Sequence, residues 1–304
     1  FAYEGHWFGL GHLVDSVDGL TNDGALAAEK YLMGYVIEKS LSVDNIFIIA
    51  LIFSSFGVPQ IYQHRVLFWG ILGALLLRGV MIAIGAMVIA EYHWVLYLFA
   101  AILILTAIKM LFFNSENADP SNNYVVRLTR RLFPVTSKLH GEHFLVRAGT
   151  PESIESEYPG APIIMDDVVS KATTGSLLLT PLALALVMVE TTDLIFAVDS
   201  IPAIFAITGD PFLVYTSNVF AILGLRSLYF VFAGMSEKFQ YLKVSLALIL
   251  LLVGMKIIFA EWLKMTLGKH FNLYLLAVVF LLLAAGVVAS IIKYRRQLIV
   301  QNNQ

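Results

Sequence analysis

The chain of 304 residues contains no cysteine and few charged residues, and these shortages narrow the classes of protein it can belong to. Without cysteine there are no disulfides, no thiolate metal sites and no cysteine nucleophile. Charged residues make up 14% of the chain and the net charge is −2, which excludes the basic surface of a general nucleic-acid-binding protein. The sequence motifs of serine hydrolases, zinc proteases and phosphate-binding loops are also absent. We therefore predict that the chain is not an enzyme and holds no organic cofactor.

Hydrophobic residues make up 59% of the chain, and the mean hydropathy is +0.79. A soluble domain cannot bury so much apolar surface, so the composition indicates a polytopic membrane protein. A membrane-spanning helix needs about 20 mainly apolar residues. Seven stretches meet this requirement: 38–56, 65–90, 94–112, 177–206, 212–233, 243–261 and 272–292.

Lysine and arginine are concentrated in the connections on one side of these seven spans. Cytoplasmic connections of membrane proteins carry this excess, so we predict that the loop 113–176 and the C-terminus are cytoplasmic. We expect the protein to lie in the bacterial inner membrane, with lipid around its spans. The loop 113–176 could also bind a protein partner. Within the loop, HFLVR (143–147) and PIIMDDVV (162–169) are expected to pair as a hairpin.

Two parts of the chain resemble each other, which predicts an internal duplication. EKSLSVDNIFIIALIFSSFGVP (38–59) and FWGILGALLLRG (68–79) match DLIFAVDSIPAIFAITGDP (193–211) and VFAILGLRS (219–227). The third helices also match, as LTAIKMLFF (105–113) and LVGMKIIFA (252–260). Because the two first helices enter the membrane from opposite sides, the repeats are inverted, as in many secondary transporters.

The predicted fold class is therefore an all-α polytopic membrane protein with two inverted three-helix repeats and extra flanking spans. In each acidic motif the two acids are six residues apart, about 240° around a helix, so they share a face only where the helix is broken. Pro202 supports such breaks, which we place at the membrane midplane. The predicted parts are an extracytoplasmic segment 1–23, a first repeat 24–112, a cytoplasmic loop 113–176, a second repeat 177–262, and a C-terminal span with a cytoplasmic tail 263–304.

Ionisable residues inside the predicted spans are the candidates for a functional site, because a charge at the bilayer centre costs about 2.5–3.5 kcal/mol. Their oxygen atoms suit hard divalent cations such as Mn²⁺, Ca²⁺ and Mg²⁺. Mn²⁺ is the expected substrate, with Ca²⁺ and Mg²⁺ as alternatives. The predicted metal ligands are Glu38, Asp44, Asn45, Asp193, Asp199 and Ser200.

A further group of polar residues could support these ligands or act in gating: Glu190, Arg78, Lys109, Asn218, Arg226 and Lys256. Either arginine could neutralise the empty site, or protons could replace the cation, and the sequence leaves both routes open. Each residue also has a plainer explanation. The arginines could form structural ion pairs, Asn218 could cap a helix, and the two lysines could extend their ammonium groups to the membrane surface.

EKSLSVDN (38–45) and ETTDLIFAVDSIPAIFAITGDPFLVYTSNVFAILGLRSLYF (190–230) resemble the hallmark segments of the TerC family of integral membrane proteins. This family is named from tellurium resistance, includes Alx-type manganese exporters and belongs to the LysE-like transporter superfamily. The resemblance implies Mn²⁺ export, with the family's acidic residues at Glu38, Asp44, Asp193 and Asp199, and a further span before Phe1. The family name leaves a second role open, as a membrane component of a tellurite or metal stress-resistance complex that does not itself transport.

Overall fold

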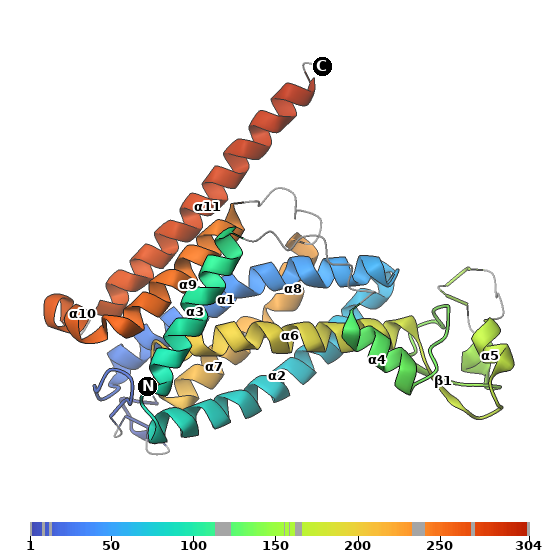
Figure 1. Cartoon of the computed structure of the whole chain (residues 1–304), viewed down its shortest axis with the longest axis horizontal. Coiled ribbons are helices and arrows are strands. Elements are labelled where there is room, and N and C mark those ends of the chain that lie inside the picture. The colour runs from blue at the N-terminus through green and yellow to red at the C-terminus, as the bar shows by residue number, and fades with distance from the viewer. Residues whose placement is uncertain are drawn as a thin grey trace. The chain divides into compact units, whose positions relative to one another are not determined.

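The fold is helical, with one small sheet (Figure 1). The computed structural model describes residues 2–7, 10–11, 14–112, 123–154, 156–157, 159–161, 166–232, 241–268 and 271–302. The chain divides into two compact units, which are described separately. The first unit comprises Phe1–Ile46, Leu75–Asn114 and Phe196–Gln304, and the second comprises Phe47–Ala74 and Ser115–Ile195.

Within the described residues, five helical stretches are long and apolar enough to cross a membrane. They are α2 (Gln60–Glu91), α3 (Val95–Phe112), α6 (Pro181–Phe205), α7 (Pro211–Leu223) together with α8 (Leu225–Phe232), and α11 (Phe271–Asn302). Helices α9 (Leu242–Ile258) and α10 (Ala260–Leu267), bent by 86°, form a sixth if they count as one span. This confirms an all-α polytopic membrane protein and matches six of the seven predicted stretches.

The remaining predicted span, 38–56, lies within α1 (Gly24–Ser55). Helix α1 is 32 residues long, but it does not have the composition of a plain apolar span. Every stretch of 18 residues in α1 contains at least three charged residues, because Glu38, Lys39 and Asp44 lie so close together. The charged residues that make α1 a functional candidate are therefore also the reason why it does not resemble a plain apolar span.

The predicted breaks at the acidic motifs are wrong, because α1 and α6 pass through both motifs as continuous helices. Pro202 lies in the last turn of α6, where its missing N–H group removes one hydrogen bond shortly before the helix ends at Phe205. The interruptions occur elsewhere, at Gly224 between α7 and α8 and at Phe259 between α9 and α10.

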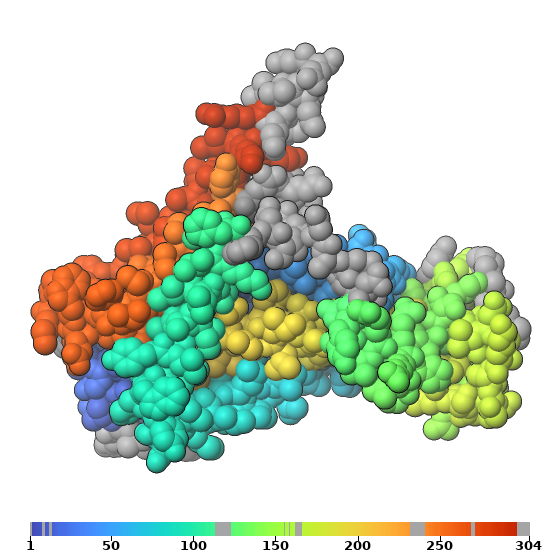
Figure 2. Space-filling view, in the orientation of Figure 1, coloured from blue at the N-terminus to red at the C-terminus, as the bar shows by residue number. Residues whose placement is uncertain are grey.

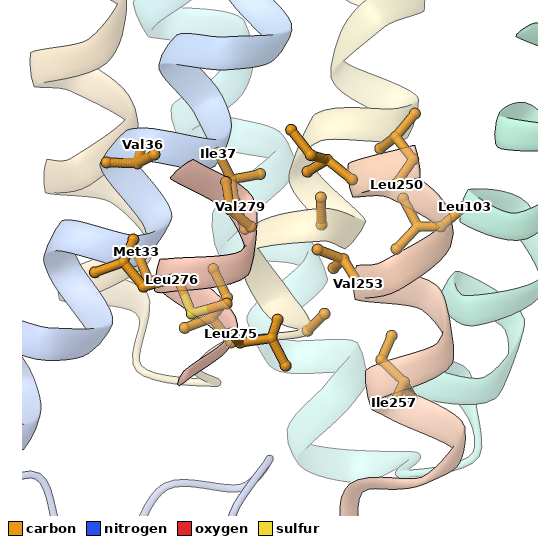
Figure 3. Close-up of a cluster of buried hydrophobic side chains, with 14 of the residues drawn as sticks. Met33, Val36, Ile37, Leu103, Leu250, Val253, Ile257, Leu275, Leu276 and Val279 are labelled. Atoms are coloured by element: carbon orange, nitrogen blue, oxygen red, sulfur yellow. The ribbon is translucent and has the colours of Figure 1, made fainter. Parts of the chain in front are cut away.

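The core of the first unit forms around α9, which packs against both α3 and α11. In Figure 1, α3 and α9 run in opposite directions. Figure 3 shows buried side chains of α1, α3, α9 and α11 meeting in this core, among them Met33, Ile37, Leu103, Leu250, Val253, Leu275 and Val279.

Gly254 of α9 explains how closely α9 and α3 approach. A Cβ atom at this position would lie 3.2 Å from the carbonyl oxygen of Ala100 and 3.3 Å from Cβ of Leu103. Small residues at such contacts let spanning helices pack tightly, and packing is the main source of helix association in lipid. Helix α3 lies on the surface shown in Figure 2. Its Tyr97 and Leu105 side chains are exposed. That exposure suits a helix that faces lipid.

The second unit contains the described part of the loop 113–176. Its elements are α4 (Tyr124–Leu132), β1 (Leu145–Arg147), the 3₁₀ helix η3 (Pro151–Ile154), α5 (Asp167–Lys171) and β2 (Leu177–Leu179). Strand β1 pairs antiparallel with β2, with Val146 opposite Leu178. The predicted hairpin partner, 162–169, is therefore wrong. Residues 162–165 lie outside the described residues, and 167–169 belong to α5, which begins at the N-cap Asp166.

Candidate functional site

Arg78 of α2 is the centre of a buried polar group in the first unit, which we call the Arg78 cluster: Glu38, Arg78, Ser200 and Asn218. Its Nη1 atom forms an ion pair with Glu38 of α1. The same atom donates to Oγ of Ser200 on α6, at 3.1 Å, and to Oδ1 of Asn218 on α7, at 3.4 Å. All four residues are at most 2% exposed. Four helices thus bring a cation, an anion and two neutral polar groups together.

The Arg78 cluster retains unused polar atoms. Nδ2 of Asn218 has no hydrogen-bond partner among the described residues, and neither has the hydroxyl of Ser42. Ser42 follows Glu38 by four residues, so both lie on one face of α1. A buried polar atom without a partner carries a free-energy cost of about 1–3 kcal/mol. Water or a bound ion at these atoms would relieve that cost.

Asp199 of α6, which is half-buried, is contacted by α3. The hydroxyl of Thr106 donates to Oδ1 of Asp199 at 2.8 Å. Lys109 follows Thr106 by three residues and is exposed, and its charge acts on Asp199. The sequence analysis did not predict that Thr106 contacts a candidate ligand. Thr106 lies one turn before Lys109 in the third helix of the first predicted repeat, and this position could have indicated it.

The other predicted ligands lie on α1 and α6. Asn45 is buried and Asp44 is half-buried on α1, whereas Asp193 is half-buried on the part of α6 that belongs to the second unit. Arg226 is exposed at the start of α8 and is not part of the Arg78 cluster. Among the described residues, no three histidine, aspartate or glutamate side chains gather closely enough to hold a metal ion. The carboxylate metal site stays a prediction.

The two Ile-Leu-Gly segments, 71–73 and 222–224, share an arrangement that was not predicted. In the second unit, the carboxylate of Glu190 lies against the α-carbon of Gly73. In the first unit, the ammonium of Lys39 lies against Gly224 and donates to the carbonyl oxygen of Ala221 at 2.9 Å. Each glycine therefore leaves room for a charged side chain from the first helix of the other predicted repeat. Lys39 adjoins Glu38 and was missed as a site residue.

Lys256 of α9 does not extend to the membrane surface, so that explanation is wrong for this residue. It is 3% exposed and donates to the carbonyl oxygen of Ala206 at 2.5 Å, just beyond the end of α6. Its ammonium lies 5.1 Å from the ring centroid of Phe271, which is within cation–π range. Lys109, its counterpart in the first repeat, is exposed, as that explanation requires.

A second buried cation, Lys30 of α1, lies near the start of the chain. Its Nζ atom is 2.8 Å from Oδ2 of Asp15 and 2.7 Å from Oδ2 of Asp18, and it donates to Oδ1 of Asn22 at 2.6 Å. The side chains of Lys30 and Asp15 are fully buried. We call Asp15, Asp18, Asn22 and Lys30 the Lys30 cluster. The ammonium donates to Asp15 and Asn22 and forms an ion pair with Asp18, so three protein oxygens surround the buried cation.

Comparisons with known proteins agree with this architecture. The family model described as "Integral membrane protein TerC family" matches residues 24–298. An uncharacterised membrane protein of Myxococcus xanthus is 45% identical over 266 residues, which cover 88% of this chain and 74% of that protein. A membrane protein of Rickettsia felis is 40% identical over 272 residues, covering 90% of this chain and 80% of the relative.

A third relative carries a functional name. Alx of Escherichia coli, named as a proposed membrane-bound redox modulator, is 43% identical over 232 residues, which cover 76% of this chain and 64% of Alx. No solved structure matches the chain. The residues matched by the family model include the helices that carry the Arg78 cluster.

Proposed function

Because the chain belongs to the TerC family of integral membrane proteins, and because it buries charges inside its long helices, we propose that it is a secondary transporter of divalent metal cations. The cation, with Mn²⁺ as the first candidate, passes through an acidic site by alternating access. Export from the cytoplasm across a bacterial inner membrane is the proposed direction, with the loop 113–176 on the cytoplasmic side as a surface for a protein partner.

The Arg78 cluster is the observation that carries this proposal. A charge buried among spanning helices is costly and marks ion pathways and their counter-charges. Here Arg78 is paired with Glu38, one of the predicted ligands, while Asn218 and Ser42 keep unused polar atoms. A guanidinium paired with Glu38 in this way can neutralise the acidic site when the transporter returns without its cargo. After releasing its cation, the transporter could return with its acidic site neutralised by an arginine or by protons. Of these two routes, we favour neutralisation by Arg78 over proton antiport.

Two packing features support the inverted repeat on which alternating access depends. The third helices of the predicted repeats, α3 and α9, pack against each other and run in opposite directions (Figure 1). Gly73 and Gly224 occupy the same place in the two Ile-Leu-Gly segments, and each is contacted by a charged side chain of the other repeat. Related helices that meet in an antiparallel manner are expected where inverted repeats enclose a site.

The available ligand atoms favour hard cations. The predicted ligands Glu38, Asp44, Asn45, Asp193, Asp199 and Ser200 supply only carboxylate, amide and hydroxyl oxygens. Mn²⁺, Mg²⁺ and Ca²⁺ accept such ligands, whereas soft metals prefer sulfur. Mn²⁺ is proposed as the substrate, and Ca²⁺ and Mg²⁺ are the competing substrates for a direct comparison.

A second candidate is a membrane component of a metal or tellurite stress-resistance complex that does not transport. The Arg78–Glu38 pair favours it to the extent that a buried ion pair can be purely structural. The name of the Escherichia coli relative points to redox control. In this chain such a role would not use thiols, since the 304 residues contain no cysteine.

Cation flux into proteoliposomes tests the transporter. We expect Asp44→Asn and Asp199→Asn each to lower Mn²⁺ flux at least tenfold, a change of about 1.4 kcal/mol, because each removes a ligand charge. Glu261→Gln is the matched control, since it removes an exposed carboxylate from α10, and its flux should equal that of the wild type. Flux that persists in both aspartate variants would exclude the site, and absence of flux in the wild type would favour the complex component.

An Arg78→Gln arm separates the two return routes. If Arg78 neutralises the empty site, the variant stops net Mn²⁺ flux but still exchanges Mn²⁺ for Mn²⁺, because exchange never requires the empty protein to return. If protons neutralise the empty site instead, net Mn²⁺ flux persists in Arg78→Gln and depends on pH.

A further inference from the structure

Residues 14–23, which we call the N-terminal strap, fold against the turn between α6 and α7. The Lys30 cluster anchors the strap to α1 through Asp15, Asp18 and Asn22. Asp15 also accepts hydrogen bonds from the turn itself, from the hydroxyl of Thr208 and, at 2.8 Å, from the N–H group of Gly209. One buried carboxylate therefore joins α1, the strap and the turn.

The rest of the turn, residues 206–210, is held as firmly. Oδ2 of Asp210 accepts from the hydroxyl of Tyr3 at 2.7 Å and from Nδ2 of Asn22 at 3.3 Å, while Oδ1 caps the start of α7. At the other end, Lys256 donates to the carbonyl oxygen of Ala206. A side chain at Gly209 would collide with the hydroxyl of Ser16. The turn is thus fixed by side chains from both sides.

This turn joins the two helices that supply the neutral partners of Arg78. Ser200 lies six residues before Ala206, about 9 Å along a helix, and Asn218 lies eight residues after Asp210, about 12 Å along α7. Helices are stiff over such distances, so a displacement of the turn changes the separation of Ser200 and Asn218. Both hydrogen bonds to Arg78, at 3.1 and 3.4 Å, are sensitive to that separation.

We propose that Asp15 and Lys30 are positioning residues: through the strap they fix the α6–α7 turn, and through the turn they set the spacing of Ser200 and Asn218 around Arg78. The strap suits this task, because the buried Lys30 is paired with two carboxylates of the strap itself, those of Asp15 and Asp18. The inference concerns the geometry of the Arg78 cluster and goes beyond the proposed transport.

Spin-label distances in the purified full chain test the proposal. The chain has no cysteine, so labels at Val198→Cys on α6 and Phe220→Cys on α7, both exposed positions, carry no background. We expect Lys30→Met and Asp15→Asn to shift or broaden the label distance, and amide exchange in residues 206–210 to rise at least tenfold. Lys30→Arg should largely restore both, since a guanidinium can still donate to three oxygens.

Leu246→Ala is the matched control, because it removes a buried side chain of α9 that lies ten residues, about 15 Å along the helix, before the Lys256 contact with the turn. Its label distance should equal that of the unsubstituted labelled protein. The proposal is overturned if Leu246→Ala shifts the distance as much as Lys30→Met does, since general loss of stability then explains the effect. It is also overturned if exchange at the turn rises while the label distance stays constant. Neither measurement needs cation flux, so the outcome is independent of the transport test.

Discussion

The two Gly-x-Pro turns of the chain, 57–59 between α1 and α2 and 209–211 between α6 and α7, hold the same place in the predicted repeat but have different surroundings. A Cβ atom at Gly57 would meet no atom of the described residues within 4 Å. Gly209, in contrast, lies against Ser16 and donates its N–H group to Asp15. Gly57 is therefore exposed, whereas Gly209 is covered by the N-terminal strap.

Under the proposed inverted repeat the two turns would be equivalent, and the strap, which lies outside the repeat, makes their surroundings differ. Inverted repeats that exchange conformations need turns that can move. We expect the turn at Gly57 to meet this need, whereas the second turn is held by Asp15 and, through Asp210, by Tyr3 and Asn22. The asymmetry of the molecule therefore resides in residues that the repeat does not contain.

Replacing Lys30 should have the largest effect on the comparison. Lys30→Met leaves Asp15 and Asp18 buried without their cation, and breaking a buried ion pair in this way costs about 3–5 kcal/mol. We expect a clearly lower midpoint of thermal unfolding in detergent. If the midpoint of Lys30→Met equals that of the wild type, the Lys30 cluster does not hold the second turn.

Adding a methyl group to each turn should have a smaller effect, and it should act by different mechanisms. Gly57 has a φ of 62°, so Gly57→Ala should cost about 1–2 kcal/mol through backbone strain alone. Gly209→Ala should instead displace Ser16 and loosen the strap, and Ser16→Gly should restore it. Amide exchange of residues 14–23 distinguishes the two. Faster exchange in Gly57→Ala would contradict the separation of the turns.

Acid should produce the smallest change, confined to the strap. Burial would raise the pKa of Asp15, but Lys30 and the hydrogen bonds from Lys30, Thr208 and Gly209 hold it below its usual value. A lowered pKa stabilises the fold above the ordinary aspartate range, and this contribution is lost as the pH falls through the lower folded value. The difference in unfolding midpoint between wild type and Asp15→Asn should thus shrink below about pH 4. A difference that is constant down to pH 2 would contradict this assignment.

Local composition made the spans and the Arg78 cluster predictable. Arg78, Glu38, Ser200 and Asn218 were all candidates, because a polar group inside an apolar stretch is costly and needs a reason. Their mutual contacts were not predictable, since Arg78 and Asn218 are 140 residues apart in the chain. The sequence therefore identified the residues of the Arg78 cluster, but only the structure shows which of them contact each other.

The strap and the helix breaks could not be predicted for physical reasons. Asp15 and Thr208 are 193 residues apart, and a polar segment before the first span looks like an ordinary solvated linker. Pro202 indicated an interruption, but a proline one turn from a helix end costs so little that α6 stays continuous. β2 was assigned to a span because its residues, Leu177–Leu179, continue the apolar run of α6.

The bend between α9 and α10 has a consequence for how the protein sits in a bilayer. Helix α10 bends away from α9 by 86°, and its Trp262 and Met265 are exposed, which suits a short helix that lies along the membrane surface. Lys264 of this helix donates to the carbonyl oxygen of Asp18 at 2.6 Å, which ties the strap to the same level. Because α10 is joined to the strap, we expect lipid chain length to affect the strap and the second turn more than the first turn.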